Sequence, residues 1–316
     1  MRTVVLYVLS GLSLMAMSGF SARPAIAAPP ITAAAFAPTG NEVLLGSQAG
    51  VEVYSWPDLK RGERLKVELA NIHDLAFSPN GHQLLIAGGT PGESGAVEVL
   101  RWPGRKPLHR VSIGEDVIYR ATWFADGARW ATAGADGTCR IFTASNFQQA
   151  SAFAGHSRAV LALGMLADGQ TALSAGADHS LRLWAASSGQ EIRGFDNHLG
   201  IINDLALQPQ REPGTLPLVA TVSDDRTVRL WQPTIGRMVR FAKLTAVPRT
   251  VAWSRDGQQL LVGCDDGKLR VIDPATAEIV KTVPGINGRV YVLLIDPAKD
   301  RRVLLAGEGG AVAFEW

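Results

Sequence analysis

The chain has 316 residues, of which 47% are hydrophobic and 19% charged, and its formal net charge is +2 at pH 7. A balance this close to neutral gives no support to binding of nucleic acid or of an anionic membrane through net charge. Gly (33) and Pro (17) interrupt short runs rich in Val, Leu and Ala, and helix signals are scarce beyond the first twenty residues. The composition therefore favours an all-β protein.

Residues 1–27 have the features of a secretory signal peptide. Arg2 gives a positive start, residues 4–20 are apolar, and Ala25-Ile26-Ala27 fits a small-x-small cleavage site. We therefore expect cleavage after Ala27 and a periplasmic or secreted protein without stable membrane insertion. Retention of the segment as a membrane anchor is the alternative, although Ser and Gly interrupt the apolar run.

Residues 28–316 form the second predicted unit, a single repetitive domain. Its clearest repeat, residues 155–184, predicts three short strands separated by turns at Asp168-Gly169 and Ala177-Asp178, with an outer strand near residues 191–195. A four-stranded sheet of this size cannot bury both of its faces alone. We therefore expect copies of it to be stacked on both sides.

Two independent landmarks recur about every 42 residues. The first inner turn recurs at 36–40, 77–81, 123–127, 165–169, 207–210, 253–257 and 295–299. The end of the third strand recurs at Tyr54, Leu100, Phe142, Trp184, Trp231, Ile272 and about Glu315. Both landmarks give seven units, which predicts an all-β, seven-bladed β-propeller with four-stranded blades.

The first and last units differ from this pattern. The outer strand of the first unit is expected at about residues 64–69. The chain ends at Trp316, where the outer strand of the last unit should begin, and a mature chain starting at Ala28 has almost nothing ahead of its first inner strand. We predict a three-stranded last blade with an exposed edge. In a chain that keeps its leader, residues 23–28 are the candidates to fill this edge.

Gly155-His156, together with Leu181-Arg182-Leu183-Trp184, resembles the WD40 repeat family, and the resemblance extends over about 31–316. In that family a His, a Ser or Thr, an Asp and a Trp form a buried hydrogen-bonded chain within a blade. The resemblance assigns these structural tetrads to His156, Ser174, Asp178 and Trp184 in the fourth unit and to His198, Thr221, Asp225 and Trp231 in the fifth.

A structural role suits these residues, because a buried Asp needs donors for its oxygens and an imidazole and turn amides supply them. The alternative is a catalytic or metal-binding role, but the Ser lies within a strand and lacks the strained turn of a nucleophile. The sequence has no haem, Walker, Gly-x-Ser-x-Gly or His-Glu-x-x-His motif, and its six His are dispersed. Cys139 and Cys264 lie three units apart, which disfavours a disulfide. We expect no catalytic residue, no cofactor and no metal.

The position eight residues before the turn landmark predicts one ring of inner side chains, formed by Thr32, His73, Tyr119, Leu161, Asn203, Arg249 and Tyr291. The ring has no carboxylate and a single His, so acid–base catalysis lacks a partner there. Two Tyr and an Arg are typical of protein-binding hot spots.

The resemblance implies a non-catalytic docking platform for a protein or peptide. The predicted partner-binding residues are His73, Tyr119, Asn203, Arg249, Arg289 and Tyr291, with Asp224, Asp265 and Glu308 from neighbouring turns. Their acidic members favour a partner with basic groups. Two alternatives stay open: an enzyme or small-ligand binder acting at the central channel, and a structural domain of a larger secreted assembly.

Overall fold

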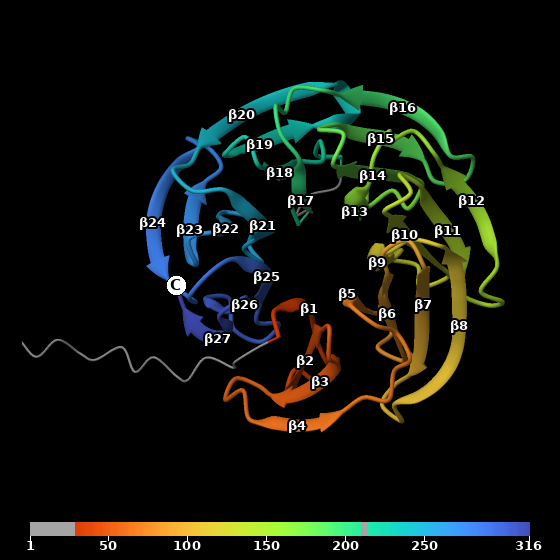
Figure 1. Ribbon diagram of the computed structural model, residues 1–316. Coiled ribbons are helices and arrows are strands. Elements are labelled where there is room, and N and C mark those ends of the chain that lie inside the picture. The colour runs from red at the N-terminus through yellow and green to blue at the C-terminus, as the bar shows by residue number, and fades with distance from the viewer. Residues whose placement is uncertain (1–28, 210–213) are drawn as a thin grey trace, which may run out of the picture.

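Seven antiparallel sheets form a ring around a central channel in the computed structural model, which describes residues 29–209 and 214–316 (Figure 1). Six sheets have four strands, and the seventh, β25-β26-β27, has three. The predicted seven-bladed propeller and the three-stranded last blade are confirmed. The leader, its cleavage site and the proposed filling of the last edge by residues 23–28 lie outside the described residues.

Each blade runs outward from the channel in sequence order. The inner strands are β1 (Ile31–Phe36), β5 (Ile72–Phe77), β9 (Ile118–Trp123), β13 (Val160–Met165), β17 (Ile202–Leu207), β21 (Pro248–Trp253) and β25 (Val290–Ile295). The second strands are β2 (Glu42–Ser47), β6 (Gln83–Thr90), β10 (Arg129–Gly134), β14 (Thr171–Gly176), β18 (Val219–Ser223), β22 (Leu260–Cys264) and β26 (Arg302–Gly307).

The third strands are β3 (Gly50–Ser55), β7 (Ser94–Arg101), β11 (Cys139–Thr143), β15 (Leu181–Ala185), β19 (Thr227–Gln232), β23 (Lys268–Asp273) and β27 (Gly310–Glu315). The outer strands are β4 (Arg61–Arg64), β8 (Lys106–Gly114), β12 (Gln149–Phe153), β16 (Gln190–Phe195), β20 (Arg237–Lys243) and β24 (Glu278–Pro284). One short 3-10 helix, η1 (Pro233–Ile235), precedes β20.

The turn between the first two strands of a blade follows from its residue types. In the fourth blade, the Asp168 carboxylate accepts backbone N–H groups of Gln170 (2.8 Å) and Thr171 (2.9 Å). Gly169 has a φ of 64°, a conformation that costs glycine little. An Asp-Gly pair therefore fixes a tight hairpin, and this explains why the pair marks the repeat in the sequence.

Hydrophobic clusters between neighbouring blades form the core. One such cluster joins Leu173 and Leu183 of the fourth blade to Ile202, Val219 and Trp231 of the fifth. A strand in the middle of a blade packs against the neighbouring blades on both faces. Accordingly, every residue of β18 is buried. The close packing between the faces of neighbouring blades makes the ring rigid. A rigid ring holds the strands that line the channel in fixed positions.

Every inner strand carries a bulge at one residue, where its pairing with the second strand shifts register. The residues left out of the ladder are Thr32, His73, Tyr119, Leu161, Asn203, Arg249 and Tyr291. These are the seven residues of the predicted inner ring. A bulge changes the direction in which a side chain points. Here the change occurs at the equivalent position of the inner strand in all seven blades.

The first blade departs from the sequence prediction in its outer strand, which is β4 at residues 61–64 instead of 64–69. Ser55 N–H donates to the Lys60 carbonyl (2.9 Å), so the preceding loop is short and β4 starts early. All four residues of β4 are exposed. The strand therefore shows no apolar alternation by which the sequence could reveal it.

Candidate functional site

The fourth blade contains a continuous hydrogen-bonded chain from its surface turn to its core. The His156 imidazole contacts the Asp178 carboxylate through Nδ1 (2.9 Å) and the Ser174 hydroxyl through Nε2 (2.8 Å). Trp184 Nε1 donates to the same hydroxyl (3.1 Å). Ser174 and Trp184 are fully buried, so no substrate reaches the hydroxyl, and the set links β14 and β15 to the loop that precedes β13.

The fifth blade repeats the arrangement with Thr in place of Ser. His198 contacts Asp225 through Nδ1 (2.8 Å) and Thr221 through Nε2 (2.8 Å), and Trp231 Nε1 donates to Thr221 (2.8 Å). Burial lowers the pKa of His198, which favours the neutral imidazole. Burial acts to raise the pKa of Asp225, but hydrogen bonds from Thr227 and His198 outweigh it and lower this pKa from 3.8 to about 2.

Neighbouring blades lack the His and differ accordingly. In the third blade the side-chain donors and acceptors of Trp130 and Thr132 are buried without a partner among the described residues. Asp136 pairs with Arg140 instead (2.6 Å). In the sixth blade, Asp266 pairs in the same way with Arg270 (2.8 Å).

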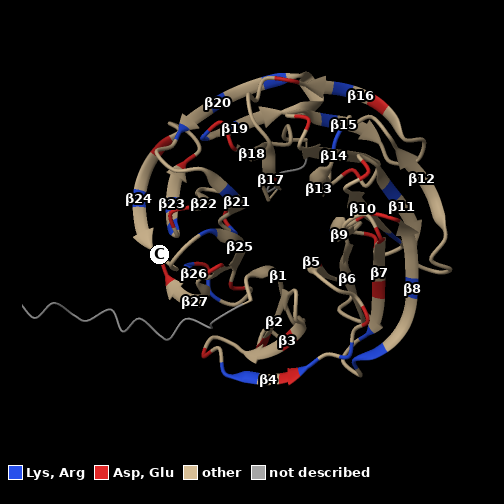
Figure 2. Ribbon diagram, in the orientation of Figure 1, with Lys and Arg blue, Asp and Glu red and all other residues tan. Residues whose placement is uncertain are grey.

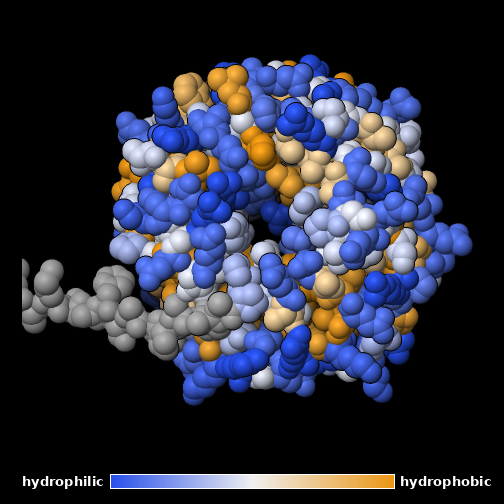
Figure 3. Space-filling model, viewed as in Figure 1, coloured by the Kyte–Doolittle hydropathy of each residue, from blue (hydrophilic) through white to orange (hydrophobic). Residues whose placement is uncertain are grey.

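The seven bulge residues line a cavity of about 710 Å³ at the centre of the ring. The space-filling view shows the face hollowed at this point, with a mostly hydrophilic surround (Figure 3). Lys, Arg, Asp and Glu are distributed around the whole ring, so neither sign of charge dominates the molecule (Figure 2). The sequence prediction of a single inward-facing ring therefore matches where these side chains lie.

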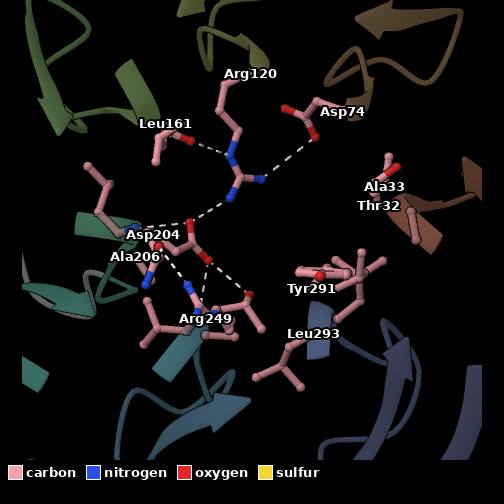
Figure 4. Close-up of a pocket in the computed structure, with 18 of the residues that line it drawn as sticks. Thr32, Ala33, Asp74, Arg120, Leu161, Asp204, Ala206, Arg249, Tyr291 and Leu293 are labelled. Carbon is pink, nitrogen blue, oxygen red and sulfur yellow. Dashed lines mark hydrogen bonds and ion pairs between the residues drawn. The ribbon is translucent and has the colours of Figure 1, made fainter. Parts of the chain in front are cut away.

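Beside this ring lies an ionic bridge that the sequence analysis missed (Figure 4). Arg120 extends into the channel, donates through Nη2 to Asp204 (2.7 Å) and through Nε to the Leu161 carbonyl (3.1 Å), and lies 3.9 Å from Asp74. The predicted ring itself has no carboxylate, but the residues next to it add two carboxylates to the channel. Each bridge residue directly follows a bulge residue, and both members of each pair line the cavity.

The carboxylates of this bridge are held by backbone donors of the next blade. Asp204 accepts the Val251 N–H (3.1 Å) and the Thr250 hydroxyl (2.9 Å). Asp74 accepts the Ala121 N–H (3.0 Å). These bonds tie adjacent inner strands together, which is a structural role.

On the fifth to seventh blades, the predicted partner-binding residues hydrogen-bond to one another. Arg249 donates to Asp224 (2.9 Å), and so does the Asn203 amide (2.8 Å). Tyr291 donates to Glu308 (3.0 Å), and the Arg289 guanidinium lies 3.6 Å from the same carboxylate. Asp224 and Glu308 therefore have cationic partners within the chain, whereas among the described residues Asp265 accepts a single bond, from the Val247 N–H (3.1 Å).

The second and third blades contribute an aromatic pair. The rings of His73 and Tyr119 meet edge to face, with centroids 5.1 Å apart. Across the same face, the Leu199 side chain is 84% exposed beside the Asp225 turn, whose carboxylate accepts the Leu199 N–H (3.1 Å). Leu199 was missed because one apolar residue in a polar loop gives no pattern.

Other kinds of site find no support in the part of the chain that is described. Residues 29–209 and 214–316 contain no cluster of three or more His, Cys, Asp or Glu that could hold a metal. Cys139 and Cys264 are free and buried, and burial raises the pKa of both thiols to about 12. No helix within those same residues is long and apolar enough to cross a bilayer.

Comparison with known proteins gives repeat-level matches. Residues 147–185 and 189–232 match the family described as WD domain, G-beta repeat. The chain therefore contains WD40 repeats. Residues 214–295 match the WD40 domain of anaphase-promoting complex subunit 4. The first two matches include both complete His-Ser/Thr-Asp-Trp sets, from His156 to Trp184 and from His198 to Trp231, so they fall on the two blades that have full tetrads.

A 78-residue stretch is 36% identical to Coronin-7 of Bos taurus. This stretch covers 24% of the present chain and 8% of Coronin-7. The chain thus matches only a small part of that relative.

Proposed function

We propose that the protein is a non-catalytic interaction platform, exported from the cytoplasm, that binds a protein or peptide on the face formed by the inner-strand bulges. The observation that carries the proposal is the bulge repeated in all seven blades. Each bulge aims one side chain at a shared mouth, and the resulting ring combines Tyr, His, Arg and Asn. This mixture suits a protein hot spot.

WD40 propellers generally bind protein partners, which supports the same reading for the WD40 repeats of this chain. An enzyme acting in the channel is the alternative. The contacts of the two channel carboxylates favour the platform over the enzyme, because both already accept hydrogen bonds within the protein. Asp204 is bound by Arg120 and by a backbone N–H, and Asp74 also accepts backbone N–H groups. Neither is placed as a free general base.

The partner is best sought by affinity purification from the native host, with the mature chain as bait. We expect a stoichiometric protein. Mass spectrometry of the exported chain tests the proposed export at the same time, and a chain that begins at Met1 and stays with the membrane contradicts cleavage after Ala27.

The binding face is tested by replacing Tyr119, Arg249 and Tyr291 together with Ala. We expect the dissociation constant for the recovered partner to rise about tenfold or more, because hot-spot residues typically contribute more than about 1 kcal/mol each.

The matched control replaces Met238, Arg240 and Phe241 of β20, which are exposed on the outer rim. This control should bind the partner normally. A folded face variant that binds like the parent, or loss of binding in the rim variant, places the partner elsewhere. Thermal melting of both variants establishes that they are folded.

A further inference from the structure

Charge is distributed unevenly around the mouth of the channel, the face at which the inner strands begin. On the fifth to seventh blades, Asp224 and Glu308 have Arg partners within the chain. On the second and third blades, the exposed Glu93 and Glu115 and the half-buried Asp116 have no cationic partner among residues 29–209 and 214–316. Apart from Asp265 on the sixth blade, which accepts a backbone N–H, the uncompensated negative charge of the described residues therefore lies on one side of the mouth, next to Tyr119.

Asp74 extends this negative charge into the cavity. Its side chain is 16% exposed, and its oxygens accept the N–H groups of Leu75 (2.9 Å) and Ala121 (3.0 Å). The nearest guanidinium, that of Arg120, stays 3.9 Å away because it binds Asp204 and the Leu161 carbonyl. Two carboxylates thus share one guanidinium, and the bridge has a net formal charge of −1.

An aromatic wall stands beside this carboxylate. His73 precedes Asp74 at the bulge, and its ring meets that of Tyr119 edge to face. Among the described residues, neither side chain makes a hydrogen bond. Burial lowers the pKa of His73, so the imidazole is neutral near pH 7 and does not repel a cation.

We propose that this side of the mouth receives one cationic side chain of the partner, a lysine or an arginine, whose aliphatic stem packs against His73 and Tyr119 and whose charged group faces Asp74. The cavity of about 710 Å³ has room for such a side chain. Aromatic faces attract cations, and the attraction of a carboxylate is stronger in a partly desolvated cavity than in water. Glu93, Glu115 and Asp116 steer the cation toward the mouth.

This inference rests on the proposed platform function, since it names the chemistry that the same face selects. It is tested on the full chain with three probes that need no knowledge of the partner: acetyl-Gly-Lys-Gly-amide, acetyl-Gly-Arg-Gly-amide and the neutral acetyl-Gly-norleucine-Gly-amide. Ligand-observed NMR titration gives their dissociation constants. We expect both cationic peptides to bind at least about tenfold more tightly than the norleucine peptide.

Three variants locate the site. Asp74→Asn should raise the dissociation constants of the cationic probes about tenfold. The double variant Glu93→Gln and Glu115→Gln should raise them about two- to fivefold and make them less dependent on salt concentration. Glu278→Gln, an exposed carboxylate on β24, is the matched control and should change nothing. If Asp74→Asn fails to fold, Tyr119→Leu takes its place, with the same expected loss.

Equal binding of the norleucine peptide, or unchanged binding in both Asp74→Asn and Tyr119→Leu, overturns the inference. The platform proposal fails separately. If the Tyr119, Arg249 and Tyr291 variant loses the partner while no cationic probe binds, the platform stands and the cation site is wrong. If the probes bind as expected while that variant keeps its partner, the cation site stands and the platform is wrong.

Discussion

Asp178 and Asp225 each lie at the centre of a hydrogen-bonded network within a blade, and we predict that their role is structural. Each accepts its hydrogen bonds from a buried imidazole and from turn donors, and each His is in turn bound to a buried hydroxyl. An isolated carboxylate at such a site would be costly, whereas a fully satisfied network fixes the strands that it joins.

Replacing Asp178 with Ala should lower the free energy of unfolding by about 1 to 3 kcal/mol, because the His156 ring and the Ser157 and Ser180 amides lose their acceptor. Urea unfolding measures the change. Asp136→Ala is the matched control and should cost less than about 1 kcal/mol, since that carboxylate is 39% exposed and pairs with Arg140. An Asp178→Ala protein of unchanged stability that no longer binds its partner would show a functional role.

The fifth-blade tetrad predicts a loss of stability in acid. The pKa of Asp225 is lowered in the folded state, so its contribution is complete above about pH 4 and is lost as the pH falls toward 2. The pKa of His198 is also lowered, so the unfolded chain takes up its proton first and stability begins to fall below about pH 6.5.

Urea unfolding at pH 7, 5 and 3.5 tests this dependence. Asp225→Asn keeps an acceptor for the His198 ring but has no proton to gain, so its stability should fall by about 0.6 kcal/mol less than that of the parent over this range. Equal slopes for the two proteins would assign the acid sensitivity to other groups.

At the scale of the strand, the sequence predicts the inner ring well and the ionic bridge not at all. Thr32, His73, Tyr119 and the other ring residues keep a fixed offset from an Asp-Gly type turn, and hairpin geometry preserves that offset. Asp74 and Asp204 were missed because strict alternation turns every second side chain away from the channel. The bulge breaks that alternation, so two consecutive residues line the cavity.

A signal for the bridge was present in the sequence. Asp74 lies in Ile-His-Asp-Leu-Ala and Asp204 in Ile-Asn-Asp-Leu-Ala, so the same charged position recurs within otherwise apolar inner strands. A charge inside a buried strand requires a partner. The partner, Arg120, could not be named in advance, because it joins the third blade to the fifth and only the closed ring brings them together.

The last blade gives a prediction at the level of one strand. Among the described residues, β27 pairs with β26 alone, so about half of its amide groups point away from any partner. Hydrogen exchange measured by mass spectrometry should be faster for β27 than for β23, which is paired on both sides. The doubly paired β26 serves as the slow control. Equal protection of β27 and β23 would show that residues 1–28 or another chain cover the edge.

Across the whole molecule, the blades are joined unevenly around the channel. Side chains at the inner strands join the first blade to the second through Thr32, the second to the third through Asp74, and the third to the fourth and fifth through Arg120. In the described parts of the chain, no such channel bond joins the seventh blade to the first. Trp56 makes that connection away from the channel, where its Nε1 donates to Asp296 (2.7 Å).

Ring closure therefore depends on the Trp56–Asp296 bond more than on any single bond at the channel. Asp296 is 1% exposed, and Trp56→Phe keeps the ring packing while removing the indole donor from Oδ2 of this carboxylate; Oδ1 keeps the Ala298 and Lys299 N–H groups, and Arg302 stays 3.6 Å from Oδ2. We expect a loss of about 1.5 to 3 kcal/mol in urea unfolding, the range for bonds to charged groups. Trp253→Phe is the matched control, because its Nε1 donates to the neutral Ala206 carbonyl (3.0 Å), and it should cost about 0.5 to 1.5 kcal/mol. If Trp56→Phe is no more destabilising than Trp253→Phe, the ring is closed mainly by the apolar packing of Ile31, Leu45 and Leu304 between the first and last blades.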